Sequence, residues 1–347
     1  MNRRTALQAS ALCLVAASGL AAGRDADTDA LAWSAWKARF LSGDGRIIDD
    51  GNGGISHSEG QGFGALLAQA NGDRAAFHKI EAWTRANLLV RDDHLMGWRW
   101  HEGRGVAAED HVTATDGDLF RAWALLRAAR DSGWSEWEGR AADIADDIAT
   151  LCLRPDPRVS GSPLLTPGSA SRADAKRVLI NPSYIMPRAL RELGGAAARP
   201  ALIAAADHGE TVLAELAASG PVPDWIDVTP EGYAAPAEHD LLSGFDALRV
   251  PLYLVWSGNA EHVAVTRGED VMARADLAGH VAVVTTPGGE VRAQSDFAGY
   301  RAIGNLTSCS QTAETLGTSA RQPYYPATLG LLATLAVREG GACKPRL

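Results

Sequence analysis

The chain has 347 residues, of which 46% are hydrophobic and 22% are charged, and this composition is typical of a globular protein with a large core. Its formal net charge of −9 gives it no electrostatic reason to bind nucleic acid or anionic lipid, whereas an uncharged ligand is compatible with this charge. No linker-like stretch divides the chain, so we expect one domain rather than two.

The first 22 residues have the layout of a secretory signal peptide. Arg3 and Arg4 form a short positive region, and a mostly apolar stretch covers residues 6–17. This stretch is too short and too often interrupted by polar residues for a good membrane span, and no other stretch could cross a membrane. We therefore expect a signal peptide at 1–22, a mature domain at 23–347 and a periplasmic or secreted protein. An uncleaved anchor is the alternative, and the export route stays open.

Most of the mature chain has the pattern of successive amphipathic helices, because apolar residues recur three and four positions apart. Each such segment has one apolar face that can pack on a core. In chain order, the expected helices cover residues 33–40, 63–70, 77–88, 119–126, 144–151, 201–216, 242–256, 271–277 and 328–337.

Two stretches break the helical pattern. Residues 281–293 combine β-branched runs with a central Pro-Gly-Gly, which predicts a short β-hairpin. Residues 155–172 are rich in proline, glycine and serine and predict a long loop, which is often part of a binding surface. The expected fold class is all-α with a small β-hairpin. Periodicity alone leaves a helical barrel, a solenoid and two bundles open.

The densest motif is a glycine-rich segment at 51–64 that runs into a helix. Glu59 falls in the first turn of that helix if Ser58 is the N-cap. A glutamate there interacts favourably with the helix dipole and needs no catalytic role. The alternating glycines around it cost helix stability, however, and they make sense where the backbone must leave room for a ligand. This favours a functional role for Glu59.

A second motif places Asp116 and Asp118 on either side of a glycine at the start of another helix. Thr113, Thr115 or Asp116 is the expected cap of this helix. Capping explains one acid, but two acids exceed what a cap requires. The segment lacks the spaced oxygen ligands and the terminal glutamate of a calcium loop.

The third motif contains Asp246 and Arg249, which are three positions apart and therefore fit on one helix face. An ordinary surface ion pair is the plain interpretation. The residues around the pair are apolar, however, and burial of an ion pair without purpose would cost stability.

Aromatic residues form the fourth feature. Trp98 and Trp100 lie close together, and Trp225 and Tyr184 lie near predicted helix ends. These aromatic residues are interpreted either as part of the core, which is a structural role, or as rings that stack on the C–H face of a sugar, which is a functional role. The chain has ten tryptophans against six phenylalanines, and this ratio mildly favours sugar stacking.

Cysteines give no sign of a metal site. Cys13 lies in the expected signal peptide, and Cys152, Cys309 and Cys343 are too widely spaced for a zinc pattern or a dense disulfide framework. At most one disulfide is expected, and buried or inert cysteines are at least as plausible.

Three motifs follow one another in the chain: Ser-His-Ser-Glu-Gly-Gln-Gly-Phe-Gly at 56–64, Ala-Thr-Asp-Gly-Asp-Leu at 114–119 and Gly-Phe-Asp-Ala-Leu-Arg-Val at 244–250. In this order and spacing they resemble glycoside hydrolase family 8, and most closely its endoglucanases encoded beside bacterial cellulose synthase. The agreement extends over most of the mature chain. Further segments that look like that group lie at 33–40, 90–93 and 97–100.

The resemblance implies an (α/α)6 barrel, with six inner and six outer helices and an open cleft at one end. It implies inverting hydrolysis within a β-1,4-glucan chain, of cellulose or a similar polysaccharide. Glu59 matches the family's general acid, Asp246 its general base, and Asp116 the acid that holds the sugar at the cleavage point. Arg249 matches a residue that positions the base, and Tyr184 matches an active-site tyrosine.

This chemistry sets demands on the expected site. Inversion needs a protonated acid at the leaving oxygen and a base that activates water on the opposite face. We expect Glu59 to keep its proton through partial burial or the nearby Asp116, and Asp246 to stay ionised because of Arg249. No metal and no organic cofactor are required. Arg121 stands where the family usually has an aliphatic residue, and this departure concerns packing rather than chemistry.

Substrate and role remain open at this stage. The favoured partner is a β-1,4-glucan, with a possible association with cellulose synthase machinery. We predict aromatic substrate contacts from Trp98, Trp100 and Trp225, beside Tyr184 and Arg249. A chitosanase or xylanase on the same scaffold is the first alternative. A non-catalytic polysaccharide-binding protein, which would not need both Glu59 and Asp246, is the second, and a structural helical solenoid is the third.

Overall fold

The computed structural model describes residues 28–137, 139–174, 176–308 and 322–340. The expected signal peptide, Cys309 and Cys343 lie outside these residues. Cys152 is buried and not part of a disulfide. Within the described ranges, no helix is both long enough and apolar enough to cross a membrane.

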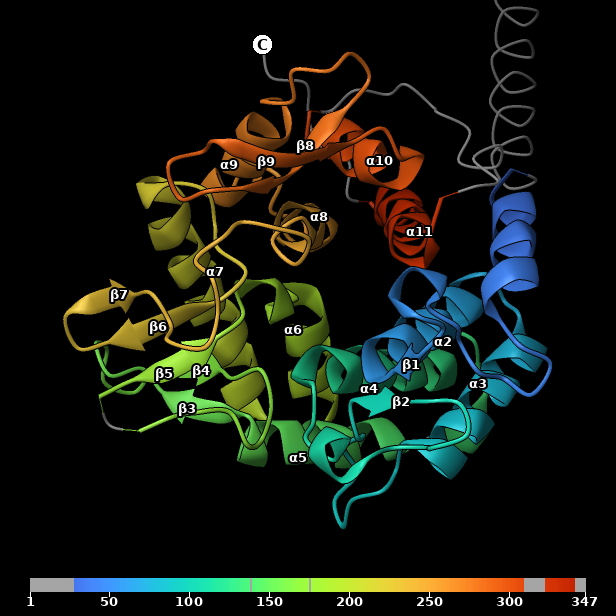
Figure 1. The fold of residues 1–347 in the computed structure, drawn as a ribbon. Helices are drawn as coiled ribbons and strands as arrows, with labels where there is room; N and C mark the ends of the chain where they lie inside the picture. Colours follow the sequence, from blue (N-terminus) through green and yellow to red (C-terminus); the bar gives the residue numbers. More distant parts are fainter. Residues whose placement is uncertain (1–27, 138, 175, 309–321, 341–347) are drawn as a thin grey trace, which may run out of the picture.

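Helices make up most of the fold, and from the first described helix to α9 they alternate along the chain between an outer and an inner ring, after which α10 is a second outer helix and α11 an inner one (Figure 1). The outer ring contains the helix at residues 28–40, α3 (Arg74–Asn87), α5 (Arg140–Leu151), α7 (Pro200–Ser219), α9 (Val263–Met272) and α10 (Ala298–Thr307). The inner ring contains α2 (Ser58–Ala70), α4 (Thr115–Arg130), α6 (Pro187–Ala196), α8 (Arg249–Trp256) and α11 (Tyr324–Arg338). This arrangement confirms the expected (α/α)6 barrel. The interpretations as a solenoid or as two bundles are therefore wrong.

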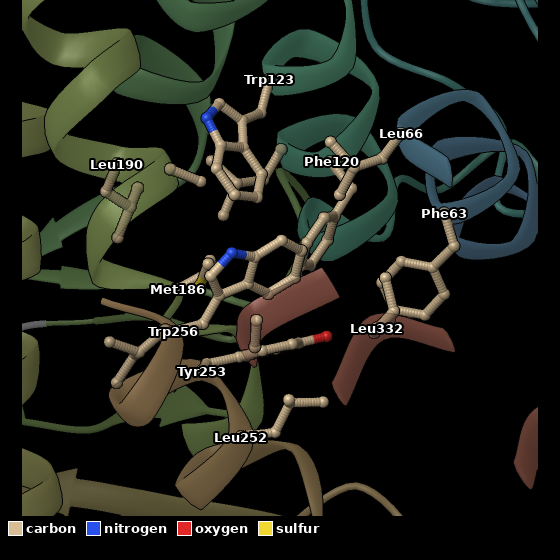
Figure 2. Close-up of a cluster of buried hydrophobic side chains, with 14 of the residues drawn as sticks. Phe63, Leu66, Phe120, Trp123, Met186, Leu190, Leu252, Tyr253, Trp256 and Leu332 are labelled. Atoms are coloured by element: carbon tan, nitrogen blue, oxygen red, sulfur yellow. The ribbon is translucent and has the colours of Figure 1, made fainter. Parts of the chain in front are cut away.

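The core lies where the inner helices face one another. Figure 2 shows large side chains from α2, α4, α6, α8 and α11 meeting there. Phe63 and Phe120 pack edge to face with ring centres 4.7 Å apart, and Phe120 also contacts Tyr253 at 5.3 Å. Trp123 and Trp256 lie 5.1 Å apart. Each of these rings is almost fully buried. Aromatic burial of this kind stabilises the ring of helices beyond what helix propensity supplies.

Strands are short and antiparallel, and they connect the helices. The pairs are β1 (Ser56–His57) with β2 (Arg99–Trp100), β3 (Leu153–Pro155) with β4 (Pro163–Leu165), β5 (Val178–Ile180) with β6 (Ile226–Thr229), β6 with β7 (Gly232–Ala234), and β8 (Val281–Thr285) with β9 (Val291–Ser295). The last pair confirms the predicted hairpin. The predicted loop at 155–172 is partly wrong, because β4 lies within it.

Two predicted helices differ from the structure. The segment at 242–256 is helical only from Arg249, because the amides of Gly244 and Ala247 bond to the side chain of Asp224 instead of to a helical carbonyl. The predicted helix at 271–277 is displaced, since α9 begins after His262, whose side chain caps it. The sequence did not predict α6 and α10, which have ten residues each and so repeat an apolar pattern too few times.

Candidate active site

Arg249, the first residue of α8, is the centre of the candidate site. Its side chain is 1% exposed and forms ion pairs with three acids that are far apart in the sequence. Nη1 pairs with Glu59 and lies 3.5 Å from Oδ2 of Asp116, while Nη2 lies 2.8 Å from Oδ1 of Asp246. The three motifs therefore meet at one guanidinium group, as the sequence predicted for Arg249 and Asp246.

The acids converge because they lie at the starts of inner helices. Glu59 is in the first turn of α2, Asp116 is in the first turn of α4, and Asp246 lies in the turn that leads into α8, two residues before its N-cap Leu248. The N-terminal ends of these helices thus lie close together. The partial positive charge of a helix N-terminus stabilises nearby carboxylates, which helps a cluster of acids to exist in one place.

The N-terminus of α2 fixes the position of Glu59. The cap is His57, not the predicted Ser58, and its Nδ1 accepts the N–H of Gly60 at 3.0 Å. Nε2 of His57 lies 3.3 Å from Asp49, so this imidazole joins the helix start to the preceding loop. The side chain of Glu59 is 14% exposed, which leaves it reachable from solvent.

The glycines of the first motif serve a different purpose from the predicted one. A methyl group at Gly62 would lie 2.8 Å from the carbonyl oxygen of Gly117, and a methyl group at Gly64 would lie 2.9 Å from Ile47. These glycines therefore make room for protein atoms, not for a ligand. Gly62 lets α2 pack directly on α4, which carries Asp116, whereas Gly64 lets α2 pack on Ile47 and on Ile80 of α3.

Asp116 is the most deeply buried of the three acids, with 3% of its side chain exposed. Burial raises its pKa to about 7, although hydrogen bonds from the Gly117 amide and the Tyr184 hydroxyl oppose the shift. The predicted cap of α4 was wrong, because Ala114 occupies that position without a side-chain cap. Asp118 faces elsewhere, since it is fully buried and accepts the amide of Met96 at 2.8 Å.

Asp246 is the most accessible of the three acids, with 31% of its side chain exposed. Burial raises its pKa to about 7, and the nearby carboxylate of Asp224 raises it further. The amide of Asn181 donates a hydrogen bond to Oδ2 at 2.9 Å, which opposes the shift. We expected Arg249 to keep Asp246 ionised, but the raised pKa of Asp246 goes against this expectation, and the same guanidinium also pairs with Glu59.

A closed hydrogen-bond circuit orients Asp246 and Arg249. Nη2 of Arg249 donates to Oγ of Ser183 at 2.7 Å, and that hydroxyl donates to Oδ1 of Asn181 at 2.7 Å. Asn181 then donates to Asp246. Ser183 and Asn181 were not predicted as site residues, although both lie in the segment that was singled out for Tyr184. The sequence feature that could have identified them is that two polar residues stand on either side of Pro182, directly after the buried strand β5.

The predicted aromatic contacts fall into two groups. Trp225 packs edge to face with Tyr184 at 6.3 Å and stacks on His239 with ring centres 4.1 Å apart, so it lies beside the predicted active-site tyrosine. Trp98 and Trp100 are half-buried near the start of α2. The carbonyl of Trp98 accepts the amide of Ser58 at 2.9 Å.

Trp100 also has a packing role, because its ring lies 5.3 Å from that of Trp83. Within the described ranges, the rings of Trp98 and Trp100 contact Arg99, Arg46 and Trp83 rather than the three acids, so sugar stacking by these two rings stays a prediction. No group of three or more His, Cys, Asp or Glu in the described part of the chain is arranged to hold a metal ion.

Arg121, which stands where the family usually has an aliphatic residue, pairs with Glu81 inside the protein. Its guanidinium donates two hydrogen bonds to Glu81 of α3, at 2.9 and 2.7 Å, and both side chains are almost fully buried. Arg140 adds a second cation 3.7 Å from Glu81. The pair joins an inner helix to an outer helix and leaves the three site acids untouched.

Comparisons with known proteins agree with this geometry. The family model described as glycosyl hydrolases family 8 matches residues 4–338. An endoglucanase of Cellulomonas uda is 36% identical over 230 residues, which cover 65% of this chain and 63% of that protein. A probable endoglucanase of Novacetimonas hansenii is 32% identical, over 70% of this chain and 72% of that protein.

Solved structures extend the likeness to the fold. A GH8 endo-β-1,4-glucanase from an Achatina fulica gut metagenomic library superposes with a TM-score of 0.80 and 30% identity, over 89% of this chain and 97% of that one. The endo-β-1,4-glucanase of Acetobacter xylinum gives a TM-score of 0.78 and 29% identity, over 90% and 99%. With its barrel, its ring of acids and a family match over almost its whole length, the chain belongs to glycosyl hydrolases family 8 and is a glycoside hydrolase.

Proposed function

We propose that this protein is an inverting endo-β-1,4-glucanase that hydrolyses cellulose or a similar β-glucan within the chain. The observation that carries the proposal is the meeting of Glu59, Asp116 and Asp246 at Arg249 in a family 8 hydrolase. The relatives named above are called endoglucanases, which supports the same activity and substrate class.

In the proposed reaction Glu59 is the general acid and Asp246 is the general base. Glu59 gives its proton to the glycosidic oxygen while the bond from that oxygen to the anomeric carbon breaks. Asp246 takes a proton from a water molecule whose oxygen bonds to the anomeric carbon from the opposite face. The products are two shorter chains, and the new reducing end has inverted configuration.

The remaining groups hold the reactants and their charges. Asp116 and Tyr184, which are hydrogen-bonded to each other, are placed to hold the sugar at the cleavage point. When Glu59 is protonated, one negative charge around Arg249 is removed. The guanidinium group then pairs with the carboxylates of Asp246 and Asp116. The raised pKa of Asp246, about 7, makes it a stronger base than an ordinary aspartate near neutral pH.

Aromatic rings supply the contacts to the rest of the polysaccharide. Trp225, beside Tyr184, is placed to stack on a sugar next to the cleavage point, and Trp98 and Trp100 would contact units farther along. An apolar ring face against the C–H face of a pyranose leaves the sugar hydroxyls hydrated. The acidic chain needs no charged substrate for this mode of binding.

We propose that the protein acts in the periplasm or outside the cell and that its role is connected with bacterial cellulose synthesis. The secretory layout of residues 1–22 and the resemblance to endoglucanases encoded beside cellulose synthase support it. Association with the synthase machinery belongs to the same proposal.

Viscometry of carboxymethyl cellulose tests the activity. An enzyme that cuts within the chain lowers viscosity much faster than reducing ends appear. Parallel assays on chitosan and xylan compare the alternatives on the same preparation. Loss of viscosity only on chitosan or xylan would overturn the proposed β-glucan substrate. Binding of polysaccharide without any hydrolysis would overturn the proposed enzymatic activity.

A further inference from the structure

The turn that carries Asp246 is held by a carboxylate from outside the three motifs. Oδ1 of Asp224 accepts the backbone N–H of Gly244 at 2.9 Å and that of Ala247 at 2.8 Å. These amides lie on either side of Asp246 in the chain, so both bonds fix the backbone from which the Asp246 side chain projects. The N–H of Asp224 donates to the carbonyl of Leu242 at 2.8 Å, which ties the two segments together once more.

The packing leaves this turn little freedom to move. A methyl group at Gly244 would lie 2.5 Å from Oδ2 of Asp224, so only glycine fits against the carboxylate. Ser243, the preceding residue, forms two backbone hydrogen bonds with Thr285 of β8, at 3.0 and 2.8 Å. The turn is thus held on one side by Asp224 and on the other by the β8–β9 hairpin.

We propose that Asp224 is a positioning residue for the general base: its carboxylate clamps the turn of Asp246, and its negative charge strengthens Asp246 as a proton acceptor. This inference rests on the role proposed for Asp246 above. Asp224 does not touch the reacting atoms in this scheme, so it acts only through Asp246.

The charges around Asp246 explain why Asp224 matters. Burial and the carboxylates of Asp224 and Asp116 disfavour the ionised form of Asp246, the hydrogen bond from Asn181 favours it, and its pKa is about 7. Arg249 places a cation 2.8 Å from Oδ1 of Asp246. Burial raises the pKa of Asp224 as well, against its two amide bonds. Among the described residues, the hydroxyls of Tyr184, Tyr253 and Tyr325 also lie near enough to Asp246 for its charge to add to the rise of their pKa values, which burial mainly causes.

The variant Asp224→Asn separates charge from shape, because the amide oxygen still accepts both N–H groups. The acidic limb of kcat/KM against pH reports the base of the free enzyme. We expect this limb to move to lower pH by roughly one unit, the usual spread of carboxyl pKa values in proteins. An unchanged limb would show that the charge of Asp224 does not act on Asp246.

The variant Asp224→Ala removes the clamp itself. We expect kcat to fall roughly 10²-fold, the effect of a displacement of about 1 Å at a reacting group, with little change in KM. Asp143→Asn, at an exposed position of α5, controls for the loss of one negative charge and should leave the pH profile unchanged. A folded Asp224→Ala protein with wild-type kcat would overturn the clamp.

A measurement without substrate keeps this inference distinct from the proposed activity. The ¹³C NMR signal of the Asp246 carboxyl, assigned by its loss in Asp246→Asn, gives the pKa directly in wild type and in Asp224→Asn. If the pKa of Asp246 is the same in both proteins, the charge of Asp224 does not act on Asp246, even if the enzyme is active. Conversely, full activity of Asp246→Asn would overturn Asp246 as the base, whatever Asp224 does to its pKa.

Discussion

Gly117 of α4 lies so close to Ser58 of α2 that a methyl group at position 117 would stand 2.5 Å from the carbonyl carbon of Ser58. Glu59 follows Ser58 and Asp116 precedes Gly117 in the sequence. The point where the two inner helices touch therefore sets the separation of the proposed general acid and the acid that holds the sugar.

The first prediction is that Gly117→Ala disturbs both stability and activity. The methyl group must push α2 and α4 apart, which should lower the free energy of unfolding by about 1–3 kcal/mol. Because Glu59 and Asp116 shift with their helices, kcat should fall more than KM rises. Gly195→Ala, at an exposed position of α6, is the control, since no atom lies within 4 Å of its methyl group. Chemical denaturation and steady-state kinetics measure both effects, and a neutral Gly117→Ala would refute this packing argument.

The second prediction concerns Glu59→Gln. The amide has the same shape and cannot donate the proton, so activity should fall by about 10²–10⁴, the usual worth of general acid catalysis. Folding should survive, because one charge in a first helical turn contributes only about 0.3–1 kcal/mol. Glu231→Gln, in an exposed turn, is the matched control. Retained activity in a folded variant would show that Glu59 is merely a helix-terminus charge.

The third prediction concerns stereochemistry. If Asp246 activates water, its carboxyl in the complex with substrate lies about 6.5–9.5 Å from that of Glu59, whereas a nucleophile needs about 5–5.5 Å. Cleavage of a β-glucan should then first yield the α-anomer at the new reducing end. Proton NMR in the first minutes, before mutarotation, reads the anomer. Early β-anomer would mean retention and would exclude Asp246 as the base for water.

The fourth prediction uses the buried pair of Arg121 and Glu81. Replacing Arg121 alone by methionine leaves a buried carboxylate with only the more distant Arg140, so stability should drop by about 3–5 kcal/mol. The double variant Arg121→Met, Glu81→Leu should recover most of that loss, because no charge is left unpaired. Wild-type kcat is expected in the double variant. A double-mutant cycle by denaturation checks the coupling, and additive losses would contradict it.

The fifth prediction concerns Asp156, whose side chain is buried against Arg158 and His208. Although burial acts in the opposite direction, hydrogen bonds from Arg158 lower its pKa to about 2, below the unfolded value of about 3.9. A lowered folded pKa stabilises the protein above pH 4, and this contribution disappears as pH falls from about 4 to 2. Asp156→Asn should therefore cost roughly 1–2 kcal/mol at pH 7 and almost nothing at pH 2. Unfolding curves across pH measure this difference, and a constant difference would refute it.

Local sequence patterns determined much of the fold. Apolar spacing located most of the helices because each must bury one face, and the Pro-Gly-Gly turn located the β8–β9 hairpin. Where a side chain far along the chain captures backbone amides, as Asp224 does before α8, the local pattern failed. The caps of α2 and α4 were also wrong, since His57 and Ala114 take these positions.

The sequence by itself also singled out Glu59, Asp116, Asp246 and Arg249 as candidates, because residue type and spacing within short motifs are local properties. Only the tertiary structure decided that all three acids share one guanidinium group and that Asp224 holds the turn of Asp246. Separation along a chain does not limit which helix ends meet in a barrel. Such contacts follow from how the helices pack, and the close approach of Gly117 to α2 is a distance that no local pattern contains.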